Sequence, residues 1–387
     1  MSESLKIAFY TDTFLPAVDG VVTSILTFKE ELEKRGHTVH LFASGNSATK
    51  NLSHKYKNVH VVRGIRFKKY PQYNLALFPY LTSMRDSRHM DIIHAHTPFM
   101  MGSAALLAAK VNKTPIVGSF HTLFTNSSVI KEYTSSNRLA QRLAKKYAWS
   151  YARWFYNNMD GVIAPSNTVA ALLERKGMAN VHTIPNSIDL KRFDSSTGPG
   201  KLRKELAGGH GNVVLYVGRI SREKKLEVAI KAAQKLKKRN GPAFVFIGTG
   251  PALDYYKGMA SRLRLDDTVK FLGFVDNKML PKYYAAGDLL CMPSTFETQG
   301  IVALEAMAMG KPVVGADYLA LKELISNGRN GEKFRPGDWN GCARKIEKVI
   351  NNIDSYNETI KTAKQFSTGK VTTDLLDFYR GVMANSS

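Results

Sequence analysis

The sequence predicts an α/β fold built from two Rossmann-like domains, each a doubly wound parallel sheet. Three observations lead to this expectation. A chain of 387 residues is too long for one comfortable hydrophobic core and suits two domains of about 150–200 residues. Short apolar runs alternate with helix-length segments throughout. This alternation stops once, at a stretch rich in Gly, Ser and Pro, and then begins again.

The first half opens with a βαβ unit. Residues 5–10 form the short apolar run that is typical of a buried parallel strand. Apolar residues at helical spacing follow, Gly36 ends that helix as a C′ glycine, and residues 38–43 return to a strand. Further strands are expected at 59–62, 91–95, 115–120, 161–164 and 181–184. These elements predict an N-terminal domain over residues 1–190.

The second half repeats the pattern. We expect residues 191–211 to be a linker and residues 212–364 to form the C-terminal domain. An amphipathic segment at about 365–387 could close the second domain or pack back on the first. Strands are expected at 213–218, 244–248, 269–272, 289–292 and 312–314, with helices at 226–239 and 301–309 among the segments between them.

Composition indicates an ordinary soluble protein, with 44% hydrophobic and 22% charged residues. The longest weakly polar stretch, residues 98–109, is well short of the roughly 20 residues that a membrane-spanning helix needs. The polar start of the chain does not resemble a signal peptide. Cys291 and Cys342 lie in apolar surroundings without metal-ligand spacing, so we expect two reduced core thiols in a cytoplasmic protein.

The charge is unusual, because 55 Lys and Arg against 32 Asp and Glu leave a net charge of +23. The excess is shared almost equally by the two halves. Such a balance suits an anionic partner, which could be a nucleic acid, an acidic membrane surface or a phosphorylated substrate. A solvated basic surface without a partner is the alternative.

The most informative string is residues 296–308, Phe-Glu-Thr-Gln-Gly-Ile-Val-Ala-Leu-Glu-Ala-Met-Ala. Gly300 is expected to open a helix, which would leave the N–H groups of Gly300 and Ile301 as an anion site. Glu297 could accept hydrogen bonds from sugar hydroxyls, and Glu305, two turns further on, could take those of a ribose. For either glutamate alone, an ordinary surface carboxylate would be the simpler interpretation.

This string resembles the signature of the family-four retaining glycosyltransferases, which have the GT-B fold. The resemblance implies that Thr298, Gln299, Gly300 and Ile301 bind the nucleotide-sugar donor. Gly218-Arg219 and Lys224 resemble the family's residues that clamp the donor diphosphate, and two cations after a strand suit that charge. Val275, in Gly273-Phe274-Val275, stands where relatives hold the nucleotide base.

Further motifs of the same family occur in the expected order, so the resemblance covers the chain from Lys6 to about Gly331. Phe120-His121-Thr122 matches the motif whose histidine faces the reacting sugar, although His121 could equally be a satisfied loop histidine. Residues 185–189 match the interdomain motif, with Ser187 in place of the usual Gly. Gly20, expected at the donor, follows Asp19 where relatives often carry paired glycines, so Asp19 would narrow the acceptor entrance. Gln299 stands where many relatives have Phe.

The resemblance implies transfer with retention of the anomeric configuration. Arg219, Lys224 and the N–H groups at Gly300 would stabilise the leaving diphosphate, whose oxygen takes the acceptor's proton. Glu297 and His121 would orient the sugar. The sequence has no two aspartates separated by one residue, no His/Cys metal cluster and no G-x-G-x-x-G after a domain-opening strand. We therefore expect no metal and no cofactor beyond the nucleotide sugar, which is a co-substrate.

The N-terminal domain, where this family binds acceptors, suggests a lipid acceptor. Residues 57–88 and 131–153 interleave basic side chains with aromatic ones, as an anionic membrane interface requires. The candidate contacts are Asp19, Arg66, Lys68, Lys69, Tyr70, Lys145, Lys146 and Trp149. Core packing beside a solvated basic face would give the same pattern.

The best match to these features is a peripheral enzyme at the cytoplasmic face of the cell membrane. The chain resembles monoglucosyldiacylglycerol synthases and phosphatidylinositol mannosyltransferases. UDP-glucose with a diacylglycerol-like acceptor is the first expectation. GDP-mannose with a phosphoinositol or polyprenyl-linked acceptor, or a soluble sugar or polysaccharide synthase, are the alternatives. A nucleic-acid-binding protein is the non-enzyme alternative, and we expect no nucleic-acid partner.

Overall fold

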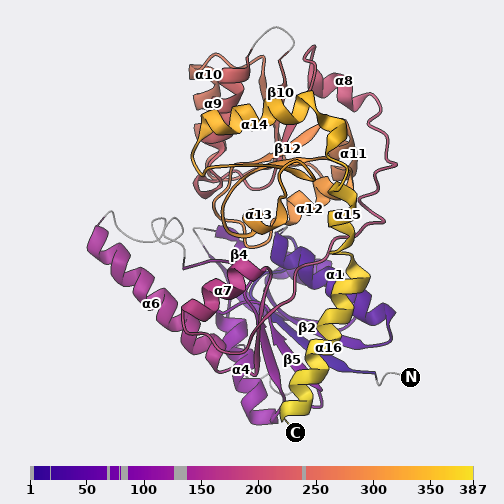
Figure 1. The fold of residues 1–387 in the computed structure, drawn as a ribbon. Coiled ribbons are helices and arrows are strands. Elements are labelled where there is room, and N and C mark those ends of the chain that lie inside the picture. Colours follow the sequence, from indigo (N-terminus) through magenta and orange to yellow (C-terminus); the bar gives the residue numbers. More distant parts are fainter. Residues whose placement is uncertain are drawn as a thin grey trace. The chain divides into compact units, whose positions relative to one another are not determined.

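The structure is a computed structural model that describes residues 4–17, 19–67, 70–77, 79, 86–125, 137–237 and 241–386. The chain divides into two compact units (Figure 1). The first comprises Met1–Ser187 together with Thr368–Ser387, and the second comprises Ile188–Ser367. Each is a Rossmann-like α/β unit, as the sequence predicts, and each is described separately below.

The first unit contains an eight-stranded sheet in the order β4-β3-β2-β1-β5-β6-β7-β8. Its strands are β1 (Lys6–Thr11), β2 (Thr38–Gly45), β3 (Val59–Phe67), β4 (Tyr70–Ala76), β5 (Ile92–Ala95), β6 (Ile116–Ser119), β7 (Gly161–Ala164) and β8 (Val181–Thr183). All neighbouring pairs are parallel except β3 and β4. The strand order reverses beside β1, and ligands of open α/β sheets bind at the carboxyl ends next to such a reversal.

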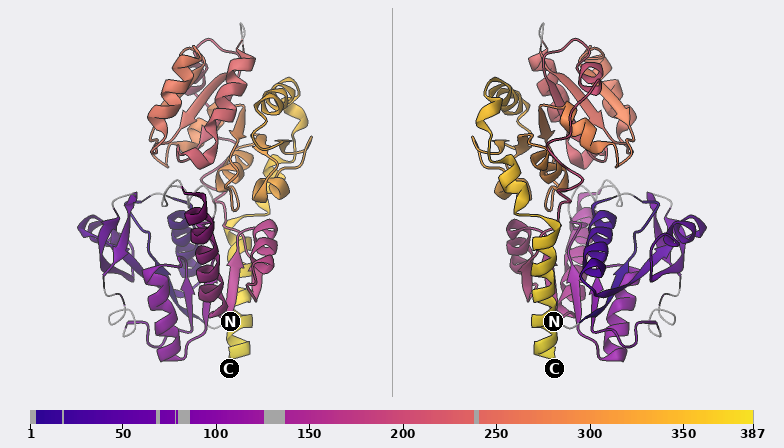
Figure 2. Two further views of the ribbon diagram at one scale, coloured as in Figure 1. Left: turned by 90° about the vertical axis from the view of Figure 1, so that its left-hand side faces the viewer. Right: turned by 90° about the vertical axis from the view of Figure 1, so that its right-hand side faces the viewer.

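The helices of this unit are α1 (Gly20–Lys34), α2 (Ser47–Ser53), α4 (Met100–Asn112), α6 (Arg138–Asn157), α7 (Asn167–Arg175) and α16 (Thr368–Ser386). Gly36 has φ +88° directly after the C-cap of α1, which is the conformation that its predicted C′ position requires. The chain's last helix belongs to this unit, because α16 lies beside α1 (Figures 1 and 2). Arg35 donates to the carbonyl of Gly369 at 2.6 Å, and Leu375 is buried in the same core as Ile25.

The second unit contains a six-stranded sheet, entirely parallel, in the order β11-β10-β9-β12-β13-β14. Its strands are β9 (Val213–Val217), β10 (Ala243–Ile247), β11 (Val269–Gly273), β12 (Leu289–Met292), β13 (Val313–Ala316) and β14 (Gly331–Phe334). The helical segments are α8 (Leu202–Ala207), η1 (Arg222–Lys224), α9 (Leu226–Leu236), α10 (Leu253–Arg262), α11 (Leu280–Ala286), α12 (Ile301–Ala308), α13 (Leu319–Leu324), α14 (Trp339–Asn351), η2 (Ile353–Ser355) and α15 (Thr359–Lys364). Here the strand order reverses between β9 and β12.

Two apolar cores hold this second unit together, one on each face of its sheet. Cys291 and Cys342 lie in one of them as free, buried thiols with 3.7 Å between their sulfurs. Residues 191–211, where we expect a linker, include α8, and both Phe193 and Leu206 are buried in the other core. Within the described residues, none of the helices has the length and apolar character needed to cross a membrane.

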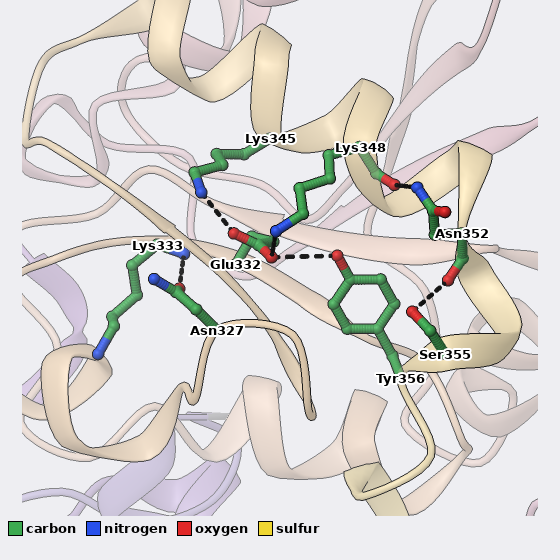
Figure 3. A network of polar contacts seen from close by, with 8 residues as sticks. All are labelled: Asn327, Glu332, Lys333, Lys345, Lys348, Asn352, Ser355 and Tyr356. Carbon is green, nitrogen blue, oxygen red and sulfur yellow. Dashed lines mark hydrogen bonds and ion pairs between the residues drawn. The ribbon is translucent and has the colours of Figure 1, made fainter.

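A buried carboxylate ties α14 to the edge strand β14 (Figure 3). The Glu332 side chain is fully buried, and its two oxygens accept from Lys345 and Lys348 at 2.5 Å each. Tyr356 donates to the same carboxylate at 3.2 Å. Burial raises the pKa of Glu332, but the hydrogen bonds from the two lysines outweigh it and hold the pKa below its usual value.

Candidate active site

The loops after β9 and β10 are packed backbone against backbone. Gly218 N donates to Ile247 O at 3.0 Å, and Ile220 N donates to the carbonyl of Thr249 at 2.8 Å. A Cβ on Gly248 would lie 1.9 Å from Gly218 O, and one on Gly250 would lie 2.2 Å from Ile220 O. Both glycines also have positive φ, so no other residue fits. We did not single out Gly248 and Gly250 from the sequence, although two glycines after a strand signal such a close approach.

Lys224 and Glu297 meet at the carboxyl end of this sheet. Lys224 Nζ lies 2.7 Å from Glu297 Oε1, and the side chains are only 19% and 15% exposed. Lys224 Nζ also lies 5.7 Å from the centre of the Phe296 ring. Lys224 ends η1 after β9, and Glu297 follows β12, so two separate sequence motifs converge where the strand order reverses.

Tyr216 places Arg219 in the same neighbourhood. The Tyr216 hydroxyl donates to the carbonyl of Arg219 at 2.8 Å. Burial raises the pKa of Tyr216 well above its usual value, and the negative charge of Glu297 adds to this effect. The backbone of Arg219 and the carboxylate of Glu297 therefore both lie close to Tyr216.

The helix α12 begins at Ile301, after Gly300 in a left-handed conformation with φ +86°. A Cβ on Gly300 would approach Leu321 to 3.1 Å, so the site has little room for a side chain. The first N–H groups of an α-helix have no acceptor within the helix and carry a partial positive charge. Gln299, immediately before Gly300, is buried. The helix start that the string at 296–308 predicts is therefore present, and its binding of an anion stays a prediction.

Glu305 is buried on the inner side of α12. Its Oε2 accepts a hydrogen bond from the Tyr284 hydroxyl at 2.7 Å. Burial raises the pKa of Glu305 to about 7, against the opposing effects of that hydrogen bond and of the Arg192 charge. Val275 packs against the same core as Tyr284. Glu305 therefore already accepts a hydrogen bond from Tyr284, and its expected contact with a ribose stays a prediction.

In the first unit, three histidines gather at the carboxyl ends of β5 and β6. His96 Nδ1 and His121 Nε2 share a hydrogen bond of 3.1 Å, and the His94 ring stacks on His96 with 4.0 Å between centres. His94 is held by the Tyr379 hydroxyl at 2.6 Å and the Ser119 hydroxyl at 2.7 Å. Burial lowers the pKa of His121 to about 4. His121 thus has a partner, and it also lines a small cavity of about 10 Å³ with His94, Ser119 and Asn186.

Asp12 is a buried carboxylate that we did not predict. Its oxygens accept from Thr97 Oγ1 at 2.6 Å and from the N–H of Met101 at 3.0 Å, so it caps the start of α4. Burial raises the pKa of Asp12 to about 6, although these hydrogen bonds oppose the increase. The donor, the N–H of Met101, is 89 residues away in sequence, so no local signal could have revealed the role.

Asp19 and Gly20 lie at the start of α1. Asp19 is the N-cap, because its Oδ1 accepts from Val22 N at 2.9 Å, and its Oδ2 accepts from Thr13 Oγ1 at 3.1 Å. Gly20 is the first residue of the helix. The geometry therefore gives Asp19 a capping role, which is separate from the narrowing of an acceptor entrance that we expect from the sequence.

The helix α6, labelled in Figure 1, contains the predicted Lys145, Lys146 and Trp149. Lys145 and Lys146 are exposed, whereas Trp149 is partly buried beneath Lys176, with 5.3 Å from Nζ to the ring centre. One stripe of the helix exposes large apolar side chains, namely Leu139 (64%), Leu143 (45%), Tyr147 (70%) and Trp154 (56%). An open groove of about 610 Å³ beside it is lined by Leu107, Lys110, Lys113 and Trp154 among others.

The remaining residues predicted to contact the acceptor or the membrane lie within residues 66–70. Lys68 and Lys69 lie outside the described residues, as do the side chains of Arg66 and Tyr70. Among the described residues, no group of three or more His, Cys, Asp or Glu side chains is placed to hold a metal ion.

Comparison with known proteins identifies the family. Residues 18–192 match the model described as Glycosyltransferase Family 4, and residues 201–366 match Glycosyl transferases group 1. An alpha-monoglucosyldiacylglycerol synthase of Streptococcus pneumoniae is 30% identical over 367 residues, which are 92% of this chain and 81% of that protein. The chain belongs to the GT-B glycosyltransferases of family four.

Further relatives agree with the assignment of this chain to the glycosyltransferases. The alpha-monoglucosyldiacylglycerol synthase of Acholeplasma laidlawii is 28% identical over 347 residues, covering 86% of each chain. The Anabaena protein HepE, crystallised with UDP and glucose, has a TM-score of 0.78 at 23% identity and covers 97% of this chain and 100% of that one. This structural likeness confirms the GT-B fold.

Proposed function

We propose that this glycosyltransferase transfers glucose from UDP-glucose, with retention of configuration, to a diacylglycerol-like lipid at a membrane surface. The transfer breaks the bond between the anomeric carbon and the diphosphate oxygen. A new bond to the acceptor oxygen forms on the same face, and the departing diphosphate takes the acceptor's proton.

The donor half of the proposal is supported by the cations and N–H groups of the second unit. The Lys224 ammonium is the half of the ion pair that suits a diphosphate, and the start of α12 offers further positive potential. In this proposal Arg219 and Lys224 stabilise the leaving group, Glu297 hydrogen-bonds the sugar, and Glu305 binds the ribose. His121 is proposed to orient the reacting sugar.

The main observation in favour of a lipid acceptor is the surface of α6. Its exposed Leu139, Leu143 and Tyr147 lie four residues apart, so they share one face of the helix. Basic residues flank this stripe at Arg138, Arg142, Lys145, Lys146 and Arg153, and α6 contains no acidic residue. A helix with one apolar stripe and flanking cations lies well in an anionic membrane interface. We infer that the enzyme binds its membrane peripherally through α6.

The relatives favour this donor and acceptor over the alternatives. Two of them are named for glucosyldiacylglycerol synthesis and align with most of this chain. One observation favours a second candidate, because a GDP-mannose-dependent alpha-mannosyltransferase of Corynebacterium glutamicum is 26% identical over 390 residues, or 99% of this chain.

A transfer assay decides between them. The purified enzyme is given labelled UDP-glucose or GDP-mannose with phosphatidylglycerol vesicles that contain diacylglycerol or phosphatidylinositol, and glycogen serves as a soluble acceptor. We expect label in a glucolipid only with UDP-glucose and diacylglycerol, and an α-linkage in the product by NMR. Label in a mannolipid would select the second candidate, and label in glycogen alone would refute a lipid acceptor.

We also propose that transfer needs no metal ion, because Arg219, Lys224 and the start of α12 would neutralise the diphosphate. The same assay repeated in excess EDTA should give an unchanged rate. A rate that falls with EDTA and returns with Mg²⁺ or Mn²⁺ would contradict this.

A further inference from the structure

The hydrogen bond between His96 and His121 has a consequence for the protons of both rings. His96 follows β5 and His121 follows the neighbouring strand β6. The rings are nearly parallel, with an angle of 13° and 5.4 Å between centres. His96 is 1% exposed, and its second ring nitrogen, Nε2, is buried without a hydrogen-bond partner in the described part of the chain.

Both rings are neutral at pH 7. Burial lowers the pKa of His96 well below its usual value, and the neighbouring His94 and His121, the ionisable groups that act on it, lower it further. Burial alone lowers the pKa of His121 to about 4. A neutral imidazole has one N–H and one bare nitrogen. The shared hydrogen bond therefore has only two possible directions.

The two directions differ in what they leave at His96 Nε2. If His121 Nε2 donates, His96 carries its proton on Nε2, where a buried N–H lacks an acceptor. If His96 Nδ1 donates, Nε2 is a bare acceptor and His121 carries its proton on Nδ1. Buried donors without a partner are rarer in proteins than acceptors without one, so the second direction is favoured.

We propose that His96 is a positioning residue that donates from Nδ1 to His121 Nε2 and so holds His121 in the tautomer protonated on Nδ1. His96 suits this role because it is packed on two sides, by His94 at 4.0 Å and by Phe9 at 4.6 Å between ring centres. His94 is in turn fixed by Tyr379 and Ser119. The hydrogen bond at one ring nitrogen sets which form the other nitrogen takes.

The consequence for catalysis rests on the proposed function. In this tautomer His121 Nδ1 is a hydrogen-bond donor, so it can orient an oxygen of the reacting sugar but cannot accept a proton there. His121 then acts on the sugar as a donor and not as a general base.

The tautomer is measured without any transfer assay. Protein labelled with ¹⁵N-histidine is studied by long-range ¹H–¹⁵N correlation at pH 7, and the His121 signals are assigned by their loss in His121→Asn. We expect a protonated Nδ1 and a bare Nε2 at His121. A protonated Nε2 at His121 would overturn the proposal, whether or not the donor and acceptor proposed above are correct.

Two variants test the positioning role. The amide nitrogen of His96→Asn can occupy the place of Nδ1, so this variant should keep the His121 tautomer and most of kcat. His96→Leu removes the donor, so the tautomer signals should change and kcat should fall about 10- to 100-fold, with little change in the KM for the donor. Equal kcat in His96→Leu and the native enzyme would overturn the role. If His96→Leu does not fold, as judged by its melting curve, the native NMR pattern and His96→Asn still decide.

Discussion

Lys224 and Glu297 are 73 residues apart in sequence and 2.7 Å apart in the fold, joined by an ion pair at the carboxyl end of the second sheet. The pair forms because β9 and β12 are neighbours, so the segments that follow them emerge side by side. Glu297 neutralises part of the Lys224 charge that we propose for binding the donor diphosphate. Binding a diphosphate would then draw Lys224 toward the stronger anion.

Lys224→Ala should therefore reduce kcat about 10²- to 10³-fold, as is typical when one charge-stabilising group is lost. The melting temperature should change little, because Lys224 is only partly buried on the short helix η1. Lys231→Ala on α9 removes the same charge from an exposed position and is the matched control. The transfer rate from labelled nucleotide sugar is measured for both variants. Equal rates for the two variants would refute a role for Lys224 at the diphosphate.

Gly250→Ala should distort the loop that follows β9. The added Cβ would meet the carbonyl of Ile220 at 2.2 Å, and φ at this position is +159°. We expect weaker binding of the nucleotide sugar together with a loss of stability above 1 kcal/mol. Gly209→Ala is the control, because Gly209 has φ +90° with no atom near its Cβ position. Calorimetric titration with UDP and thermal melts compare the two, and a Gly250→Ala protein that binds UDP normally would contradict this.

Much of the fold could be predicted from the sequence because buried parallel strands are short apolar runs. The strand β14 was not predicted, since Gly-Glu-Lys-Phe at 331–334 does not look buried. Glu332 can be buried there only because Lys345 and Lys348 on α14 reach its carboxylate, and that packing has no local signature. The strand β4 was missed for a related reason, because Pro71 and Asn74 interrupt the pattern of an antiparallel edge strand.

The candidate site shows the same limit. The string around Gly300 and the cations after β9 were predicted, since each is a local motif at the end of a strand. The hydrogen bond between His96 and His121 and the cap that Asp12 gives α4 were not, since both depend on strands that are neighbours only in the fold. Chemistry within one segment can be predicted from its residues, whereas partners from different strands require the sheet.

Glu332→Ala should destabilise the second unit by about 1–3 kcal/mol, because Tyr356 and two partly exposed lysines lose the carboxylate that accepts their hydrogen bonds. Asp354→Ala, an exposed acid nearby, should change stability by less than about 0.5 kcal/mol. Urea unfolding followed by circular dichroism measures both. A Glu332→Ala protein as stable as the control would show that the network contributes nothing.

The same carboxylate predicts a pH dependence. The folded protein holds the pKa of Glu332 below its ordinary value of 4.5, so the unfolded chain binds the proton more tightly. The stability that Glu332 contributes is therefore present above about pH 4.5 and is lost as the pH falls through the folded pKa. Glu332→Gln should lose less stability than the native protein between pH 6 and pH 3. Parallel curves for the two proteins would contradict this assignment.

The last prediction concerns the membrane surface of α6. Each Lys or Arg near an anionic membrane contributes about 1 kcal/mol to binding, so the double variant Lys145→Ala, Lys146→Ala should lose about 2 kcal/mol, or roughly 30-fold in affinity. Salt screens this electrostatic attraction, so the difference in vesicle affinity between the variant and the native protein should shrink at high ionic strength.

The matched control is Lys361→Ala, Lys364→Ala on α15, which removes the same charge from exposed positions of the second unit. Sedimentation with vesicles of graded phosphatidylglycerol content, at low and at high salt, compares the three proteins. If only total charge mattered, both double variants would weaken binding equally. If α6 is the contact, only the α6 double variant loses affinity. Replacing Tyr147 in the apolar stripe with Ser should then weaken the part of the vesicle binding that salt does not change. An exposed ring at the membrane interface contributes through its buried apolar area and not through charge.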